Sequence, residues 1–501
     1  MTTTAQPEEL RLYSLGGESK RTGLFGLPMR ATVIAGVALA VAMMVAMTGR
    51  LLVAGLLAIG ATIYLIPAIA REGNRTWYEV AQMWFQFRMA KLAGKTTYRS
   101  GPSSNIPGGR FRLPGFLART ELHVGTDMYN NQFGMIRDPA LNQYTVLISA
   151  SPRGSEPWTV TDRNLMTREW GAWLADLSLT GDVVGASATI ETVPASGQDL
   201  VQSVLNSVDE SSPEIARRIM AESAVQFTRN QLSVRGWAAM TVRAANAMQR
   251  KDPQAMATEL GQRLPGLYRQ LQYAGVSARP MTPTEVVGLA MSAYRPEVNE
   301  SVVSERVHDR DLGVDWEDAG PATAVTEWDH YRHSEYVSKT FEMAVPPQST
   351  FPDTVLRPLL EPHADLPRKR VTLVYRPFAA GESVKLVENE HNDAVNAVNA
   401  GRSGRKLTGA RVHVRLEQTE NARQSLARGA QLGQWSLLST VSLESKDKMA
   451  PATAIMSQLG NRAQMGLRPM NGQQDAAFAA ALGIGVYLHQ KSTISAFAKA
   501  G

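Results

Sequence analysis

Two histidines separated by two residues are the first side chains in the sequence that suggest chemistry. His330 and His333 stand beside Asp329 and Glu335, and imidazole and carboxylate groups are ligands that zinc uses in proteins. A zinc site needs a defined set of ligands, and no third ligand is placed on a recognisable helix near this pair. We therefore expect a polar loop here and no metal ion.

A basic stretch, GRSGRKLT from Gly401 to Thr408, is the nearest approach to a phosphate-binding loop. Such a loop needs G-x-x-x-x-G-K-[ST], in which backbone N–H groups approach the phosphates while the lysine and hydroxyl serve phosphate and magnesium. Here the glycine spacing is wrong, and Leu407 follows the lysine. No G-x-G-x-x-G opens a helix after a strand either. The stretch is predicted to be an exposed basic loop, for which a solvated face is the simplest interpretation.

Nucleophilic catalysis has no positive support in the sequence. The 501 residues include no cysteine, which excludes thiol nucleophiles, disulfides and zinc sites built on thiolates. No G-x-S-x-G elbow occurs, and Glu388 to His391 is explained by favourable negative charge at a helix N-terminus. We expect no catalytic residue and no cofactor. An enzyme would need a pocket of converging titratable groups, which the sequence does not show.

The elements that would position any functional group begin with two uncharged segments, Ala31 to Thr48 and Leu51 to Ala70. Each is about long enough to cross roughly 30 Å of hydrocarbon as a helix. Only Gly49 and Arg50 separate them, and basic residues flank the pair on both sides, so the positive-inside rule puts both termini in the cytoplasm. We predict a cell-membrane protein with a two-helix hairpin at residues 31–70. A cleaved signal peptide and two buried core helices are the alternatives.

An aromatic and basic segment, Thr76 to Lys95, follows the second span. Its mixture of rings and cations suits the lipid head-group layer, so we predict a helix that lies on the inner leaflet or continues the second span. The alternative is that its aromatic side chains pack on the soluble domain. The residues predicted at the membrane interface are Trp77, Trp84, Phe85, Arg88 and Lys91.

The rest of the chain is long enough for two or three domains. Its 52 basic against 46 acidic residues permit DNA binding without implying it. The stretch GPSSNIPGG is the first linker, because proline, glycine and serine cluster there without periodicity. The predicted divisions are a cytoplasmic tail at 1–30, the hairpin at 31–70, a juxtamembrane helix and linker at 71–109, a first α/β subdomain at 110–295, an irregular connection at 296–366 and a second α/β subdomain at 367–501.

Hydrophobic periodicity predicts strands and helices in a similar order at two places. The first place has strands FGMIRD and YTVLISA, a helix at 162–179, a strand at 183–193, a helix at 214–230, a strand at 232–243, a helix at 253–273, a strand at 276–280 and a helix at 283–294. The second has a strand at 435–444, a helix at 450–464, an extended piece at 466–469 and a helix at 473–482, which repeat the order of the last four elements of the first. Between the two places we expect a strand at 336–345 within the irregular connection, then a strand at 370–378 and helices at 389–400 and 415–431. We predict an α+β fold in which the transmembrane hairpin precedes a body with two similar βαβ-containing, ferredoxin-like halves.

The strongest sign of an internal duplication is the segment Arg-Pro-Met, which occurs at 279–281 and again at 468–470. In each copy an N-cap residue, Thr282 or Asn471, is followed three places later by Glu285 or Gln474, the spacing of a capping box. The preceding strands correspond loosely, GWAAMTVRA against QWSLLSTVSL. Chance similarity is the alternative. A true duplication requires the two helices to superpose together with their preceding strands.

Four segments of the chain resemble a family of actinobacterial conjugation proteins: RTGLFGLP, GMIRDP with YTVLISA, VSARPMTPTEVVGLAM and LRPMNGQQDAAFAAALGIGV. In that family a two-span type IV secretion membrane subunit is fused to a region similar to the N-terminal, non-ATPase half of the traffic ATPase. The last segment is similar to the one just before the ATPase domain of full-length relatives. Because this chain stops at Gly501, about where that domain would start, the resemblance implies that the ATPase is a separate polypeptide.

The resemblance implies a structural inner-membrane subunit of a conjugative DNA-transfer machine, with a cytoplasmic platform on which a traffic ATPase assembles. The other implied partners are further membrane channel subunits and the lipid bilayer, in an oligomeric assembly, and direct DNA contact stays open. The alternative is the two-span membrane component, known as component E, of an actinobacterial type VII secretion complex. A membrane-anchored enzyme is the third interpretation.

Overall fold

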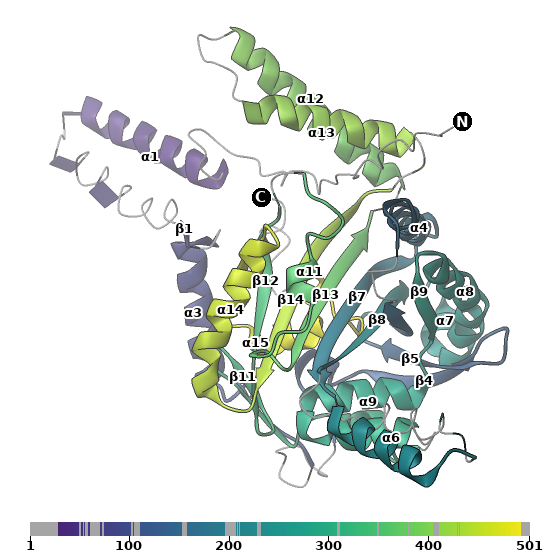
Figure 1. Ribbon diagram of the computed structural model, residues 1–501. Coiled ribbons are helices and arrows are strands. Elements are labelled where there is room, and N and C mark those ends of the chain that lie inside the picture. Colours follow the sequence, from purple (N-terminus) through teal and green to yellow (C-terminus); the bar gives the residue numbers. More distant parts are fainter. Residues whose placement is uncertain are drawn as a thin grey trace, which may run out of the picture. The chain divides into compact units, whose positions relative to one another are not determined.

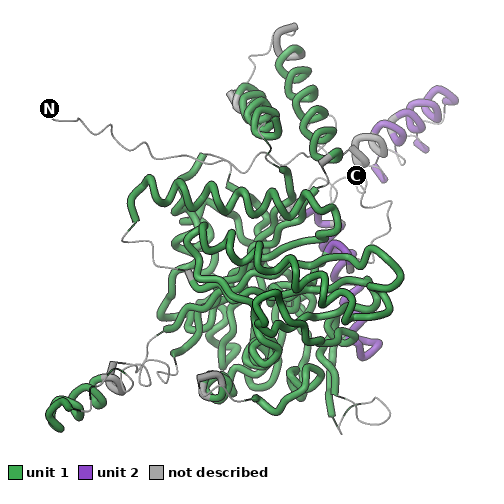
Figure 2. The backbone as a smooth tube through the Cα atoms, turned by 90° about the vertical axis from the view of Figure 1, so that its right-hand side faces the viewer, with its two compact units in different colours: residues 1–15, 96–488 green, residues 16–95, 489–501 purple. Residues whose placement is uncertain are grey.

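The chain divides into two compact units, which Figure 2 shows in two colours. Unit 1 comprises Met1–Leu15 and Thr96–Leu488, and unit 2 comprises Gly16–Lys95 and His489–Gly501. The computed structural model describes residues 29–49, 52–53, 55, 59–60, 71–72, 75–101, 104, 111–152, 158–195, 207, 209, 211–227, 232–307, 311–347, 350–378, 380–403, 410–427, 429 and 431–491.

The described residues of unit 2 include the helices α1 (Met29–Met47) and α3 (Trp77–Leu92) and, between them in the sequence, the short strands β1 (Arg71–Glu72) and β2 (Arg75–Thr76). Thr76 caps α3, because its hydroxyl accepts a hydrogen bond from the backbone N–H of Glu79 and its own N–H donates to the Glu79 carboxylate. Within the described part of the chain, no helix combines the length and the apolar composition that crossing a membrane requires. Most of the predicted tail, 1–30, and of the predicted second span, 51–70, lies outside the described residues.

Thirteen strands of the described chain form one antiparallel sheet in unit 1. Its middle is the pair β7 (Val183–Pro194) and β13 (Lys369–Pro377). On the β7 side lie, in order, β8 (Leu232–Arg243), β6 (Gln143–Pro152), β5 (Gln132–Asp138) and β4 (Glu121–Thr126). On the β13 side lie β14 (Gly433–Leu443), β12 (Tyr336–Val345), β11 (Tyr331–His333), β10 (Thr323–Thr326) and, at the edge, β3 (Thr97–Arg99). The two sides therefore have the same strand order, with β3 added at one edge.

Each side has the connectivity βαββαβ of a ferredoxin-like unit. The first half runs β6, α4 (Val160–Leu179), β7, β8, α8 (Pro253–Tyr273) and β9 (Val276–Pro280), where β9 pairs with β6. The second half runs β12, α11 (Arg357–Leu360), β13, β14, α14 (Met449–Arg462) and β15 (Gly466–Pro469), where β15 pairs with β12. A further helix follows the last strand of each half, α9 (Pro283–Tyr294) in the first and α15 (Gln474–Ala481) in the second.

Backbone pairing shows that the two Arg-Pro-Met segments occupy equivalent places. The N–H of Met281 donates to the carbonyl of Leu147 at 2.9 Å, and the N–H of Met470 donates to the carbonyl of Thr340 at 3.0 Å. The prolines just before them pair with the next residue of β6 and of β12. The residues of β6 and β9 beside these segments therefore have counterparts in β12 and β15, as the duplication predicts, and the pairing of β12 with β15 changes register only beyond Met343.

The sequence match of GWAAMTVRA with QWSLLSTVSL is misaligned, because it places Trp237 beside Trp435. Trp237 lies opposite Ser149 of β6, and the counterpart of Ser149 in β12 is Glu342, which lies opposite Leu438. The counterpart of Trp237 is therefore Leu438, three residues beyond Trp435. An odd shift moves a side chain to the other face of a strand, so the two tryptophans belong to different cores.

The two faces of the sheet carry separate hydrophobic cores. Helices α9 and α15 cover one face, where Trp237, Tyr294 and Phe478 are buried together. On the other face α4 and α8 cover the first half, and α11 and α14 pack against the second half. Figure 1 shows α4 and α8 gathered beside the strands of the first half.

The halves differ most in the segment between their second and third strands. The first half has α6 (Glu214–Phe227) there, and the second has the helix pair α12 (Ala380–Ser403) and α13 (Ala410–Ala427). Because β7 and β13 are antiparallel, the two insertions leave the sheet at opposite ends, with α12 and α13 at the top of Figure 1 and α6 at the bottom.

The prediction that residues 296–366 form an irregular connection is wrong. The segment contains α10 (Asn299–Val307), then β10 and β11, the strand β12 at the predicted bounds 336–345, and α11. Strands β10 and β11 are the counterparts of β4 and β5, and they complete the sheet of the second half. Both are too short to show a period in the sequence, and their pairing partners stabilise them.

Candidate functional site

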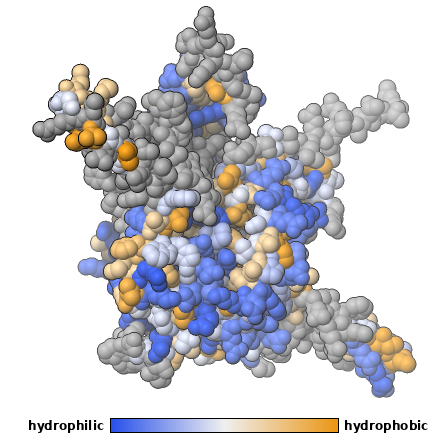
Figure 3. Space-filling view, turned by 90° about the vertical axis from the view of Figure 1, so that its left-hand side faces the viewer, coloured by the Kyte–Doolittle hydropathy of each residue, from blue (hydrophilic) through white to orange (hydrophobic). Residues whose placement is uncertain are grey.

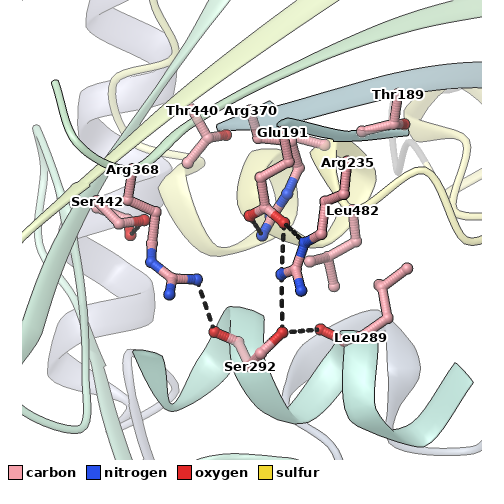
Figure 4. A network of polar contacts seen from close by, with 12 residues as sticks. Thr189, Glu191, Arg235, Leu289, Ser292, Arg368, Arg370, Thr440, Ser442 and Leu482 are labelled. Carbon is pink, nitrogen blue, oxygen red and sulfur yellow. Dashed lines mark hydrogen bonds and ion pairs between the residues drawn. The ribbon is translucent and has the colours of Figure 1, made fainter. Parts of the chain in front are cut away.

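A cluster of charged side chains is buried near the centre of the sheet, on the face that α9 and α15 cover (Figure 4). Glu191 of β7 accepts a hydrogen bond from Nε of Arg235 at 2.7 Å and another from Nη2 of Arg370 at 2.6 Å. Only 1% of the Glu191 side chain and 3% of the Arg370 side chain are exposed. Strand pairing explains the contact, because Glu191 lies directly opposite Arg235 of β8 and directly opposite Arg370 of β13.

Ser292 connects the cluster to the end of α9. Nη2 of Arg235 lies 2.8 Å from the Ser292 hydroxyl, which donates in turn to the carbonyl of Leu289. Nη1 of Arg368, the residue directly before β13, donates to the Ser292 carbonyl at 3.0 Å. The last carbonyls of a helix carry a partial negative charge equivalent to about half an electron, so a guanidinium is favourable there. These contacts fasten α9 to the sheet.

The formal charges of the cluster do not cancel, since three guanidinium groups surround one carboxylate. Burial alone would raise the pKa of Glu191, but Arg235, Arg370 and Arg368 favour its ionised form and lower that pKa to about 2. Burial lowers the pKa of Arg368 to about 10, so this group stays protonated at neutral pH. The cluster therefore keeps a surplus of positive charge, which attracts anions.

Arg370 has unused donors. Its Nε and Nη1 are buried and have no hydrogen-bond partner among the residues that the structure describes. Its guanidinium lies 5.6 Å from the centroid of the Phe478 ring on α15. A cation near an aromatic ring is attracted by the ring's quadrupole, whose faces are partially negative, and this offsets part of the cost of the missing hydrogen bonds.

A groove of about 430 Å³ opens beside the cluster. Its floor is the face of β6, β8 and β9, and its walls are α9 and α10. Arg235 lines this groove, so the cluster reaches the protein surface there. A second groove of about 960 Å³ adjoins it and shares Arg279 and Glu285 with it. The polar side chains on the floor of the smaller groove are Ser149, Ser151, Ser233, Arg235, Ser277 and Arg279.

The predicted capping box at the start of α9 lies at the rim of both grooves and is confirmed. The Thr282 hydroxyl accepts from the N–H of Glu285 at 3.3 Å, and the Glu285 carboxylate accepts from the N–H of Thr282 at 3.0 Å. Arg279 also binds this carboxylate, with 2.8 Å between Nη1 and Oε2. Glu285 therefore has a structural role in α9 and fixes the direction of Arg279.

The second predicted capping box, Asn471 with Gln474, is wrong. Helix α15 begins at Gln474 with Gln473 as its N-cap, and the buried Oδ1 of Asn471 has no partner among the described residues. The amide of Gln474 instead bridges the backbone of Thr340, accepting from its N–H at 2.8 Å and donating to its carbonyl. The Gln474 side chain is therefore hydrogen-bonded to the backbone of β12 and is not available to close a capping box with Asn471.

His333 does not lie in a polar loop, contrary to the prediction, because it is the last residue of β11, which pairs with β10 and β12. His330 lies in the connection directly before β11. His333 is fully buried, where Nδ1 donates to the carbonyl of Tyr294 at 2.7 Å and Nε2 accepts from the hydroxyl of Ser338 at 2.7 Å. Burial lowers the pKa of His333 to about 4, so the ring is neutral at pH 7. Nδ1 of His330 lies 2.8 Å from the Asp329 carboxylate. Among the described residues, no group of three metal-ligating side chains occurs.

Two further sequence candidates lie on or near α12. Glu388 to His391 lies well inside this helix, so the prediction of a helix N-terminus there is wrong. The helix begins earlier because buried Val387, Ala394 and Val398 form one apolar stripe along it. Of the basic stretch from Gly401, residues 401–403 end α12, and residues 404–408 lie outside the described residues.

The five residues predicted at the membrane interface all lie on α3. Trp77, Trp84 and Phe85 are 55%, 50% and 61% exposed. The guanidinium of Arg88 lies 5.1 Å from the Trp84 ring centroid, and Lys91 lies in the last turn of the helix. Exposed rings and cations therefore occupy the same short helix.

Sequence reasoning missed the charged cluster. Glu191, Arg235 and Arg370 lie far apart in the chain, and only the strand register brings them together. One local signal exists: Glu191 interrupts the otherwise uncharged strand VVGASATIETV, and a charge in such a strand is expected to have a buried partner.

Comparison with protein families gives a match to a family described as "Domain of unknown function (DUF8461)", over residues 20–79. Comparison with curated proteins gives no match. The matched segment lies within unit 2 and covers α1, β1, β2 and the beginning of α3. This similarity covers a small part of the chain.

Proposed function

We propose that this protein is a structural inner-membrane subunit of a conjugative DNA-transfer machine, and that unit 1 is a cytoplasmic platform for a separate traffic ATPase. The resemblance of the segments around Arg279 and Arg468 to the non-ATPase half of such ATPases suggests the kind of machine. The geometry of unit 1 suits the role of a platform. Membrane anchoring follows from the uncharged segments at 31–48 and 51–70.

The observation that carries the proposal is the joining of two similar halves into one sheet. β7 and β13 pair from Lys369 to Tyr375, so the seam between the halves is a continuous backbone ladder. The buried contacts of Glu191 with Arg235 and Arg370 cross three adjacent strands at this seam. A body whose halves are joined in this way is rigid, so the distance between its two ends stays constant, as a scaffold requires.

The two insertions give this body projecting elements at opposite ends of the sheet. Helix α6 exposes Ile215, Ile219 and Met220, which are 71%, 57% and 49% accessible and lie on neighbouring turns. In Figure 3 this helix, at the lower right, carries hydrophobic side chains beside hydrophilic ones. Exposed apolar groups on a projecting helix are typical of contacts between protein chains. We assign these elements to contacts with other channel subunits in an oligomer.

Unit 2 supplies the membrane anchor in this proposal. Residues 31–70 form a hairpin with both chain termini in the cytoplasm, and α3 lies at the inner leaflet. The exposed rings of Trp84 and Phe85 enter the head-group layer there, while Arg88 and Lys91 contact anionic lipid. The half-exposed side chains of Trp77 and Trp84 on the capped helix α3 support this assignment.

Isolation of the complex from native membranes tests the proposal. The tagged full-length protein is solubilised in mild detergent, and the copurifying chains and any bound DNA are identified. A traffic ATPase of the conjugative kind is the expected partner. A type VII secretion ATPase would instead identify the chain as the two-span membrane component of that system, and recovery with neither would contradict both assignments.

Calorimetry of the same preparation, after the ATPase is removed, separates the platform from the membrane-anchored enzyme. A platform hydrolyses neither ATP nor GTP and has no site of micromolar affinity for either nucleotide. A nucleotide site of micromolar affinity in this chain alone would overturn the platform and favour the enzyme.

A further inference from the structure

The floor of the 430 Å³ groove carries hydroxyl groups that the protein itself does not use. Ser149 and Ser151 of β6, Ser233 of β8 and Ser277 of β9 have no hydrogen-bond partner for their hydroxyls among the described residues. Strand pairing aligns them on one face, since Ser151 lies directly opposite Ser277 and Ser149 lies opposite Arg279. The sheet therefore offers several donors in a small area.

A positive charge lies on the same floor. Arg235 binds Glu191 and Ser292 through Nε and Nη2, and its Nη1 has no partner among the residues that the structure describes. Arg368 and Arg370 lie behind it, so the single carboxylate of Glu191 does not neutralise this side of the groove. Arg279 at the rim is paired with Glu285 and adds no net charge.

The second half of the fold has a different pair of side chains at the equivalent position. The counterparts of Ser149 and Arg279 are Glu342 and Arg468, which also lie opposite each other in their strands. There the two side chains form an ion pair, with 2.6 Å between Nη2 and Oε1. In the first half a serine replaces the glutamate, so the floor has no carboxylate at this position and its hydroxyls face the groove.

We propose that this groove binds the phosphate group of a small phosphate ester, with its oxygens on the hydroxyls of Ser149, Ser151 and Ser277 and on Nη1 of Arg235. A phosphate has enough acceptor oxygens to use several donors at once, and a guanidinium binds it strongly. The groove is larger than a phosphate ion, and Leu289 and Val302 on its wall provide an apolar surface for the organic part of the ester.

The substitution Ser149→Glu tests the site by giving the first half the ion pair of the second. A carboxylate at this position pairs with Arg279, as Glu342 pairs with Arg468, and it repels phosphate. The full-length solubilised protein is titrated with glycerol 3-phosphate and with inorganic phosphate at constant ionic strength, and binding is followed by calorimetry. We expect a dissociation constant on the order of 1 mM for the wild type, raised at least tenfold by Ser149→Glu.

Two further variants show whether the effect of Ser149→Glu on phosphate binding is specific to the groove. Ser277→Val removes one hydroxyl at an exposed position without adding charge, and it is expected to weaken binding severalfold. Ser457→Glu, on the exposed side of α14 on the opposite face of the sheet, adds the same charge elsewhere and is expected to leave binding unchanged.

The ligands distinguish the source of the phosphate. Binding of inorganic phosphate alone assigns the site to the free ion, and tighter binding of glycerol 3-phosphate assigns it to an ester. The proposal is overturned if neither ligand binds the wild type. It is equally overturned if Ser457→Glu weakens binding as much as Ser149→Glu, because the effect then belongs to overall charge.

Discussion

The hydroxyl oxygen of Thr189 in β7 lies 3.1 Å from the hydroxyl oxygen of Thr372 in β13, and the two residues are counterparts in the two halves. They lie directly opposite each other in the central strand pair. Thr189 lies opposite Trp237, Thr372 lies opposite Leu438, and these partners occupy equivalent places in β8 and β14. A residue that pairs with its own counterpart marks the local twofold axis, so the halves are related by a rotation about this hydrogen bond.

Removal of the Thr372 hydroxyl should destabilise the seam more than removal of the Thr189 hydroxyl. Thr372 donates its only hydroxyl proton to the carbonyl of Ala481 at 2.6 Å, so Thr189 must be the donor in the pair. Thr372→Val leaves a buried carbonyl and a buried hydroxyl without partners, which costs about 1–3 kcal/mol of the free energy of unfolding. Thr189→Val loses one hydrogen bond, which contributes about 1 kcal/mol. Urea denaturation of both variants and of the double variant measures the coupling, and strictly additive effects would contradict the contact.

Glu191→Gln should be among the most destabilising substitutions in the body. It leaves the buried guanidinium of Arg370 and the partly exposed guanidinium of Arg235 without a carboxylate, and breaking a buried pair such as Glu191 with Arg370 costs about 3–5 kcal/mol. Glu417→Gln on the exposed surface of α13 is the matched control and should be neutral. Thermal unfolding at pH 7 compares the two, and equal melting temperatures would contradict the role of Glu191.

Glu191 also predicts part of the acid sensitivity of the fold. Its pKa falls from 4.5 to about 2 on folding, so the ionised carboxylate stabilises the native state fully above pH 4.5. This contribution is lost as the pH falls from about 4.5 to about 2. Proton uptake on acid unfolding, measured by titration, should be smaller for Glu191→Gln over this range, and the same uptake in both proteins would contradict the assignment.

His333 predicts a second loss of stability on acidification, which begins at a higher pH than the loss due to Glu191. Its pKa is lowered from 6.5 to about 4, so the unfolded chain binds a proton between these values and the native state does not. Stability is therefore complete above pH 6.5 and falls by roughly 3 kcal/mol as the pH drops to about 4. Urea midpoints measured between pH 7 and pH 4.5 should fall less for His333→Gln than for the wild type. His413→Gln on α13 is the exposed control. If the urea midpoint depends on pH equally in His413→Gln and His333→Gln, the assignment to His333 is wrong.

Alanine substitution at the two predicted N-cap residues, Thr282 and Asn471, should change the free energy of unfolding by different amounts. Thr282→Ala removes a cap that the structure contains and should lower the free energy of unfolding by about 1 kcal/mol. Asn471→Ala removes a buried oxygen that has no partner among the described residues, so its effect should lie within about 0.5 kcal/mol of zero or be stabilising. Paired urea denaturation curves compare the two, and a larger loss at Asn471 would show that it caps α15 after all.

The proposed membrane topology can be tested with single cysteines, because the chain has none of its own. Arg50 is the only charge between the two uncharged segments, and Thr97 follows the anchor on an exposed position of β3. A cysteine at Arg50 should react with a membrane-impermeant maleimide added to whole cells, and a cysteine at Thr97 should react only after the cells are opened. The reverse pattern would exclude the topology.

The sequence by itself determined most of the local structure. Long amphipathic or apolar segments predict helices and strands directly, and β8, β12, α8 and α9 begin and end at the predicted residues. The capping box of Thr282 with Glu285 could also be predicted from the sequence, because both residues lie within one helical turn. The repeated Arg-Pro-Met segment was enough to indicate the two halves.

Only the tertiary structure decided how distant strands meet. The contact of Glu191 with Arg370 depends on the register of β7 and β13, and a register shift of one residue would move either side chain to the other face. The same dependence explains why Trp237 and Trp435 are not counterparts and why Gln474 binds the backbone of Thr340. Local sequence sets which residues are extended or helical, but pairing across the sheet is a property of the whole fold.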